Sequence, residues 1–194
     1  MMKRALLAEI SSITPMDAVE QRDLDRFRSL VEQECPIWRG AVPDEPDPHL
    51  VSYFPVIDPA GPWFLLGAHR KSGLWLPPGG HVEEGEHPRE TVARECQEEL
   101  RSAADFLLTF PLFFTITQTK GLNPHHDMSL WYPLRAASDG VLDFDQGEYS
   151  DMRWFNLTDL PFSQTDPNFG RFVKKILDCL GKVTPNGGVE SDAR

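Results

Sequence analysis

Residues 79–101 read GGHVEEGEHPRETVARECQEELR, and they concentrate negative charge at regular spacing beside two glycines. The segment holds seven acidic residues and few of the large apolar side chains that a core helix needs. Pro88 fits the first turn of a helix, and neither Gly nor another Pro follows it before Arg101. The sequence therefore predicts a Gly-rich loop followed by one helix over residues 88–101.

The predicted helix carries its charge and its apolar side chains on different faces. Glu95, Glu98 and Glu99 stand at positions i, i+3 and i+4, so their carboxylates project from one face. Another face has a narrow apolar stripe, formed by Val92, Cys96 and Leu100. The helix can therefore bury one side and display three carboxylates on another.

Three clustered carboxylates repel one another and raise each other's pKa. Arg94 can offset part of this charge, and a hard divalent cation offsets it better. Mg²⁺ takes oxygen ligands and commonly shares its coordination shell with substrate phosphates, whereas the sequence shows no His or Cys set of the kind that Zn²⁺ prefers. We therefore expect Mg²⁺, with Mn²⁺ as a substitute, and the alternative is a solvated acidic surface helix.

The loop before the helix has glycines at three positions. Gly79 and Gly80 let the backbone approach a ligand closely, and Gly85 permits the turn that precedes the helix. Glu86 closes the loop just before the helix begins, where the helix dipole favours a carboxylate.

The spacing of this segment resembles the Nudix box, which is Gly, five residues, Glu, seven residues and then Arg-Glu-U-x-Glu-Glu-x-Gly-U, where U is bulky and apolar. The chain matches it with Gly80, Glu86 and residues 94–100, RECQEEL. It departs at the end, where Arg101 replaces the Gly and Ser102 replaces the apolar residue, so the helix either runs on or is capped differently. Two further segments resemble the family's lead-in and closing strand: residues 74–80, LWLPPGG, and residues 153–157, RWFNL.

This resemblance implies a fold, a reaction and a set of roles. The fold is the Nudix-type α/β/α sandwich with a central mixed sheet, here with an added N-terminal helix, and the reaction is hydrolysis of a diphosphate linkage by in-line attack of water. The implied metal ligands are Glu95, Glu98, Glu99 and the Gly79 carbonyl. Arg94 would orient Glu95, and the general base is Glu95, Glu99 or Glu148, a choice that the sequence leaves open. For Glu148, a solvated loop carboxylate is the alternative.

The predicted substrate contacts are Arg70, Lys71, Gly80, Glu86, His126 and Trp131. Arg70 and Lys71 follow a predicted strand and can hold phosphates, although a surface turn explains them nearly as well. His126 belongs to the segment 125–127, HHD, interpreted as a loop between two strands, where solvated side chains are the alternative. Trp131 is one of four aromatic residues that can offer a flat face to a nucleobase, and we expect at least half of them in the core: Trp75, Phe114, Trp131 and Tyr132.

Substrate markers are informative mainly by their absence. Relatives that act on ADP-ribose often carry a Pro downstream of the box, in a region where this chain reads Thr117-Gln118. Relatives that act on dinucleoside polyphosphates often carry a Tyr slightly further on, and the nearest here is Tyr132. We therefore expect a nucleoside triphosphate, cleaved to a monophosphate and pyrophosphate. The alternatives are ADP-ribose, a nucleotide sugar or another specialised nucleotide.

Three other functions stay open. An isomerase branch of the same fold requires a catalytic Cys, whereas Cys96 lies on the apolar stripe of the helix. A non-catalytic ligand sensor would have no need of the four glutamates of the box. A partner-binding domain would use a separate surface, and the N-terminal helix offers one.

That N-terminal helix is predicted over residues 15–34, with Thr14 as its N-cap and with apolar residues on one face. Packing on the domain is the favoured role of this face, and a homodimer contact or a lid is the alternative. The Pro-rich residues 41–48, AVPDEPDP, are predicted to be a linker. The chain thus divides into an N-terminal part, a Nudix domain and a disordered tail: residues 1–48, 49–180 and 181–194.

Apolar runs of strand length are predicted at residues 50–57, 63–69, 74–76, 106–118, 129–134 and 153–155. The turn residues 58–62, DPAGP, indicate that the first two runs form a hairpin. A last helix is predicted over residues 169–180, and Gly181 ends it. This order of elements predicts an α/β or α+β sandwich in which helices cover a mixed sheet.

Composition limits the partners and the location. The 194 residues include 19 basic and 30 acidic ones, and the net charge of −11 argues against binding to the phosphate backbone of nucleic acids. No run approaches the length of a membrane span, and the first apolar run is cut by Glu9 and too short for a signal peptide. The cysteines follow no metal-ligand spacing and indicate reduced thiols in the cytoplasm: Cys35, Cys96 and Cys179. The expected partner is a small-molecule nucleotide.

Overall fold

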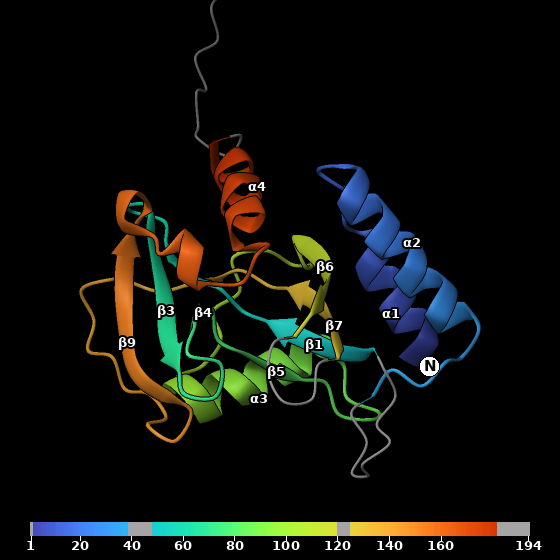
Figure 1. Cartoon of the computed structure of the whole chain (residues 1–194), viewed down its shortest axis with the longest axis horizontal. Helices are drawn as coiled ribbons and strands as arrows, with labels where there is room; N and C mark the ends of the chain where they lie inside the picture. The colour runs from blue at the N-terminus through green and yellow to red at the C-terminus, as the bar shows by residue number, and fades with distance from the viewer. Residues whose placement is uncertain (1, 39–47, 120–124, 182–194) are drawn as a thin grey trace, which may run out of the picture.

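The computed structural model describes residues 2–38, 48–119 and 125–181, and Figure 1 shows their arrangement. The α-helices are α1 (Met2–Ser11), α2 (Ala18–Glu32), α3 (Pro88–Leu100) and α4 (Phe169–Gly181). The strands are β1 (His49–Tyr53), β2 (Val56–Asp58), β3 (Trp63–His69), β4 (Trp75–Leu76), β5 (Gly79–His81), β6 (Phe113–Gln118), β7 (His126–Trp131), β8 (Leu134–Arg135) and β9 (Tyr149–Asn156). Two short 3-10 helices, Leu157–Asp159 and Phe162–Gln164, precede α4.

The strands form two mixed sheets. The first has the order β5-β1-β7-β6, in which β1 and β7 are parallel and the other pairs are antiparallel. The second has the order β4-β3-β2-β8, with β9 along β3 and with β2 parallel to β8. The predicted α/β class with a mixed sheet is therefore confirmed, and so is the predicted hairpin, which β2 and β3 form.

Two prolines mark the points where the chain passes from the first sheet to the second. Pro55 separates β1 from β2, and Pro133 separates β7 from β8. A proline has no N–H to donate to a neighbouring strand, so it interrupts the pairing. The runs predicted as single strands over residues 50–57 and 129–134 are therefore each divided, and the run over 106–118 pairs along its length only after Pro111.

Helices cover both faces of the first sheet, as Figure 1 shows. Leu50 of β1 and Leu130 of β7 join Val92 of α3 in one buried core, to which α1 and α2 also contribute. Trp131 belongs to the opposite core, where its ring stacks on Phe172 of α4. Residues that alternate along one strand thus fill two different cores, and the layers are α/β/α.

The first helix is absent from the sequence prediction. α1 buries Leu6 and Ile10 in the core beneath the sheet. Its Glu9 accepts a hydrogen bond from the Tyr132 hydroxyl at 2.9 Å and lies 3.5 Å from Nε2 of His87. The first apolar run, which Glu9 interrupts, is therefore part of a short helix with one buried face.

The second helix begins later than predicted. The Asp17 carboxylate accepts hydrogen bonds from the amides two and three residues further on, so Asp17 is the N-cap and the prediction of Thr14 is wrong. The helix then spans Ala18–Glu32. The predicted linker over residues 41–48 and the predicted tail over 181–194 lie almost wholly outside the described residues.

α2 also covers an edge of the first sheet. β6 is an edge strand, and its outward amides would otherwise be open to another chain. The Phe114 amide donates to Glu20 Oε1 at 3.2 Å, and the Ile116 amide donates to Asp23 Oδ2 at 3.2 Å. The buried Glu20 also accepts a hydrogen bond from Nζ of Lys175 at 2.6 Å. One carboxylate thus joins α2, β6 and α4.

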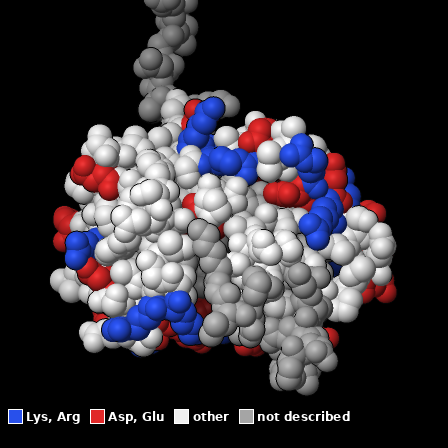
Figure 2. All heavy atoms as spheres, in the orientation of Figure 1, with Lys and Arg blue, Asp and Glu red and all other residues white. Residues whose placement is uncertain are grey.

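The surface shows mixed charge. On the face drawn in Figure 2, Lys and Arg form separate groups with acidic side chains between them rather than one continuous stripe. None of the helices in the described part of the chain has both the length and the apolar character needed to cross a bilayer.

Replacing Glu20 by Gln should destabilise the fold by about 3 kcal/mol, because Lys175 would keep a buried charge without a charged partner in direct contact. Urea denaturation at neutral pH measures this loss. Glu32→Gln at the exposed end of the same helix is the matched control and should change stability by less than about 0.5 kcal/mol. Equal losses in the two variants would contradict the role assigned to Glu20.

Candidate active site

Strand β5 places the two glycines of the box against the carboxylates of α3. A Cβ on Gly80 would lie 2.0 Å from Oε1 of Glu95, so only glycine leaves room for that side chain. The Gly79 amide donates a hydrogen bond to Glu99. The glycines that we expected to approach a ligand therefore first bring the backbone against two glutamates.

The start of α3 is fixed by reciprocal capping. Nδ1 of His87 accepts a hydrogen bond from the Arg89 amide at 3.2 Å, and the Glu90 carboxylate accepts one from the His87 amide at 3.0 Å. Pro88 occupies the first turn, as predicted. The capping contacts of His87 and Glu90 therefore fix the start of the helix at Pro88.

The end of α3 shows how the chain accommodates Arg101 in place of the Gly of the box. The helix ends at Leu100, and Arg101 takes the left-handed conformation at φ 50° where the family has Gly. The hydroxyl of Ser102 lies 3.7 Å from the buried sulfur of Cys96. The helix is thus capped by a different residue and does not run on.

Arg94 connects the loop, the helix and β5. It forms a bidentate pair with Glu86, with Nε–Oε1 at 2.9 Å and Nη2–Oε2 at 3.0 Å. It also donates to Glu95 Oε1 at 2.7 Å and to the His81 carbonyl at 3.4 Å. The bonds to Glu86, more than those to Glu95, raise the pKa of Arg94. Burial opposes ionisation of Glu86, but the hydrogen bonds from Arg94 and Thr91 lower its pKa. Glu86 therefore supports Arg94.

Glu99 is the buried carboxylate of the site. It is 3% exposed and accepts a hydrogen bond from the Tyr149 hydroxyl at 3.0 Å. Burial, followed by the charges of Glu95 and Glu148, raises the pKa of Glu99 well above its ordinary value. Burial is also the main cause that raises the pKa of Glu95, and the charges of Glu98 and Glu148 add to it. The site therefore gathers carboxylates whose charges repel one another, and Arg94 offsets only part of that repulsion.

Glu148 reaches this group from the loop before β9. Its carbonyl accepts a hydrogen bond from the Arg70 amide at 2.9 Å, and Nε of Arg70 donates to the Gln146 carbonyl at 2.8 Å. Arg70 thus braces the loop that carries Glu148, and Lys71 beside it is exposed.

The Glu98 side chain is 59% exposed and lies 3.5 Å from Arg94. The structure thus brings two sets of predicted residues together. Arg94 is hydrogen-bonded to Glu86 and Glu95, and Glu99 interacts with Gly79, Glu95 and Glu148.

Most of the aromatic candidates lie in the core. Trp131 is fully buried and donates its Nε1–H to Thr115, so the prediction that it contacts a nucleobase does not fit this structure. Phe114 and Tyr132 are also fully buried. Only Trp75 of the four keeps a partly exposed ring, which meets Phe155 edge to face at 5.0 Å between ring centroids.

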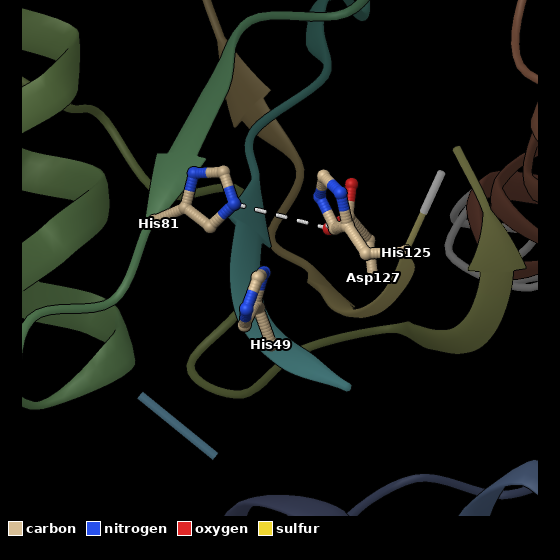
Figure 3. Close-up of side chains that lie close together, drawn as sticks. All are labelled: His49, His81, His125 and Asp127. Atoms are coloured by element: carbon tan, nitrogen blue, oxygen red, sulfur yellow. Dashed lines mark ion pairs between the residues drawn. The ribbon is translucent and has the colours of Figure 1, made fainter. Parts of the chain in front are cut away.

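One cluster of side chains was not predicted from the sequence. His49, His81, His125 and Asp127 come together in the first sheet, so the statement that the chain offers no His set is wrong (Figure 3). These residues are scattered along the sequence, and only the pairing of β1, β5 and β7 shows their proximity. The segment 125–127 is also no loop, because β7 begins at His126. His126 alternates with its neighbours and points to the other face of the strand.

The burial of Glu99 predicts that the difference in stability between the wild type and a Glu99→Gln variant depends on pH. A carboxyl with a raised folded pKa stabilises the fold below its unfolded pKa, near 4.5, and loses that contribution as the pH rises through the folded value. In a chelating buffer at pH 8, Glu99→Gln should therefore raise Tm by roughly 2–4 °C, which corresponds to about 1 kcal/mol. The gain should vanish near pH 4.

Thermal unfolding at the two pH values measures this difference. Glu98→Gln, on the exposed side of the same helix, is the matched control and should leave Tm nearly unchanged. A Glu99→Gln variant that is less stable than the wild type at pH 8 would contradict the account of a buried charge.

Comparisons with known proteins agree with this geometry. The profile of the NUDIX domain family matches residues 48–176. No curated protein sequence matches significantly. A NUDIX-family hydrolase from Clostridium perfringens superposes with a TM-score of 0.54 at 21% identity, over 68% of this chain and 97% of that one.

Two further solved structures share the fold. The NUDIX domain of NrtR from Shewanella oneidensis, in complex with ADP ribose, has a TM-score of 0.55 at 17% identity, over 68% of this chain and 87% of that one. A Deinococcus radiodurans protein has a TM-score of 0.50 at 17% identity, over 70% of this chain and 87% of that one. With a family profile that spans most of its length and with this fold, the chain belongs to the NUDIX domain family.

Proposed function

We propose that the protein is a divalent-metal-dependent hydrolase of a diphosphate linkage in a nucleoside diphosphate derivative, with a nucleoside triphosphate as the default substrate. The observation that carries this proposal is the negative charge around Glu99. Glu95 and Glu148 raise its pKa further although burial alone already opposes its ionisation. Such an arrangement is costly unless a cation joins it.

The residues at the end of the box fit a hard cation. Carboxylate and carbonyl oxygens are the ligands that Mg²⁺ takes, and Mn²⁺ accepts the same ligands. Glu95, Glu98, Glu99 and the Gly79 carbonyl would hold the ion, and the exposed Glu98 would turn from its contact with Arg94 toward it. When bound, Mg²⁺ would polarise the phosphoryl oxygens and neutralise their charge.

The protein's own side chains would position the reaction. Arg94 holds the Glu95 carboxylate, and Tyr149 holds that of Glu99. Water would form a bond to one phosphorus while the bond from that phosphorus to the bridging oxygen breaks, and pyrophosphate would leave with that oxygen. The proton of the water would pass to Glu95, Glu99 or Glu148. Burial raises the pKa of Glu95 and of Glu99, which favours acceptance of a proton by these two carboxylates.

The solvent exposure of the predicted contact residues indicates which of them can reach a substrate. Arg70 and Lys71 are exposed beside the loop of Glu148 and can reach a phosphate chain. Trp75 keeps a partly exposed ring for a base, unlike the buried Trp131. The remaining predicted contacts stay predictions: Gly80, Glu86 and His126.

ADP-ribose is the main alternative substrate. A structurally similar NUDIX domain, that of NrtR, was solved in complex with ADP ribose, but the identity of 17% supports the fold and no substrate. A nucleotide sugar or another specialised nucleotide is compatible with the same site. A ligand sensor or a partner-binding domain would bind without turnover, which the assay below separates.

The proposal also covers the role of the N-terminal helices, the cellular location and the oligomeric state. The contacts of Glu9 with Tyr132 and of Glu20 with Phe114 favour α1 and α2 as supports of the domain rather than as a separate unit. A cytoplasmic location and a homodimer remain predictions from the sequence.

The test is release of phosphate or pyrophosphate from a panel of nucleoside triphosphates, ADP-ribose, nucleotide sugars and dinucleoside polyphosphates. Each substrate is assayed with Mg²⁺, with Mn²⁺ and with a chelator. Turnover should require the metal, and Glu98→Gln and Glu99→Gln should each lower kcat by at least about 100-fold.

Glu84→Gln provides the matched control, because Glu84 is exposed in the loop of the box and has no part in the proposed machinery. It should retain wild-type kcat. Turnover that survives the chelator, or that survives both Glu98→Gln and Glu99→Gln, would refute the proposed chemistry. Tight nucleotide binding without turnover on the whole panel would favour the sensor.

A further inference from the structure

The register of the first sheet places side chains from three strands on one face. His49 pairs with Asp127 across the parallel strands β1 and β7, so the two side chains point the same way. His81 of β5 pairs with Val51, two residues after His49, and therefore shares that face. His125 stands two residues before Asp127 and continues the alternation. Four residues of metal-binding type thus meet although they come from separate parts of the sequence.

Distances confirm that these side chains form one cluster. One ligand atom from each lies within 4.8 Å of the others, and Figure 3 shows the three rings and the carboxylate around a common space. Oδ1 of Asp127 lies 3.2 Å from Nε2 of His125 and 3.8 Å from Nε2 of His81. The ring centre of His49 lies 4.8 Å from that of His125 and 5.7 Å from that of His81. His49 is buried, and the other members are half-buried.

We propose that His49, His81, His125 and Asp127, called the His3Asp cluster below, bind one transition-metal ion with the preferences of Zn²⁺. Imidazole nitrogens with a carboxylate oxygen are a ligand set that Zn²⁺ takes in tetrahedral geometry. Bonds of about 2.0–2.2 Å in that geometry place the ligand atoms about 3.3–3.6 Å from one another. Small rotations of side chains whose ligand atoms already lie within 4.8 Å would close the shell.

The His3Asp cluster is distinct from the carboxylates of the box. Within residues 2–38, 48–119 and 125–181 it is the only group of three or more such side chains drawn this close together. Gly80 presents its open face to Glu95, whereas His81, the next residue of β5, points to the opposite side. The two groups therefore lie on opposite faces of one strand and select different ions, imidazole favouring Zn²⁺ and carboxylate favouring Mg²⁺.

The cluster would act as a structural clamp. Its four members supply all the ligands of a tetrahedral shell, as in structural zinc sites. They would fasten β5 to β1 and β7, and β5 also carries the His81 carbonyl to which Arg94 donates. The ion would thus hold the strand against which Glu95 and Glu99 pack. This proposal does not depend on the proposed hydrolase activity, because metal binding and stability report on it without any substrate.

The experiment uses the untagged full-length protein, stripped with a chelator and dialysed. Zn²⁺ is added back, and the bound metal is counted by mass spectrometry of the elements and by calorimetric titration. Co²⁺ replaces Zn²⁺ in a parallel titration, because four-coordinate Co²⁺ gives intense visible absorption bands that report the geometry. Mg²⁺ at the same concentration tests the preference for a transition metal.

Two variants remove ligands and two serve as controls. His125→Gln and Asp127→Asn each delete a half-buried ligand, and far-ultraviolet circular dichroism without metal verifies their fold. His81→Gln replaces either variant if that variant fails to fold. His126→Gln is the matched control for metal binding, since His126 lies between the two ligands but faces the other way. Glu99→Gln reports whether the carboxylates of the box contribute.

The wild type, His126→Gln and Glu99→Gln should each bind one equivalent of Zn²⁺ and show the bands of four-coordinate Co²⁺. His125→Gln and Asp127→Asn should bind at least about tenfold more weakly. A hundredfold excess of Zn²⁺ over its Kd should raise Tm of the wild type by roughly 5–10 °C, and the ligand variants should lose this gain. Absence of Zn²⁺ binding by the wild type, or undiminished binding by the folded ligand variants, would overturn the proposal.

Discussion

The bidentate pair between Arg94 and Glu86 is the contact on which the site depends. It joins the loop of the box to α3, and the same guanidinium reaches Glu95 and the His81 carbonyl on β5. Charge-assisted, planar contacts of this kind fix orientation as well as distance. The loop, α3 and β5 are therefore held together by one cation. Without it, mutual repulsion would drive the carboxylates apart.

The same strand links two kinds of chemistry. On one side of β5, Glu95 and the buried Glu99 gather carboxylate oxygens of the kind that a hard cation takes. On the other side, three imidazoles and one carboxylate form a set that suits Zn²⁺. Alternation along a strand separates the two sets, so neighbouring residues serve different faces. The short strand β5, Gly79–His81, therefore contributes backbone or side chains to both groups.

The sequence predicted best where spacing alone carries the information. α3 ends within one residue of its prediction, and β3 has the predicted bounds, because helical and strand periodicity are local properties. The box residues were found because their roles require fixed spacing. Only the structure shows that Glu99 is buried and bound to Tyr149.

The remaining errors share a physical cause, which is dependence on contacts distant in sequence. α1 is short, and its burial against Tyr132 gives it its place. The burial of Trp131 depends on α4, which comes much later in the chain. The His3Asp cluster depends on the register of three strands, and no local pattern encodes that register.

A crystal structure with Mn²⁺ and a non-hydrolysable nucleoside triphosphate tests the central claim most directly, because anomalous scattering locates the ion. The account predicts an anomalous peak within bonding distance of Glu95, Glu99 and the Gly79 carbonyl, with a phosphate oxygen in the same shell. A nucleotide bound with no peak at these oxygens, or bound away from α3, would contradict it.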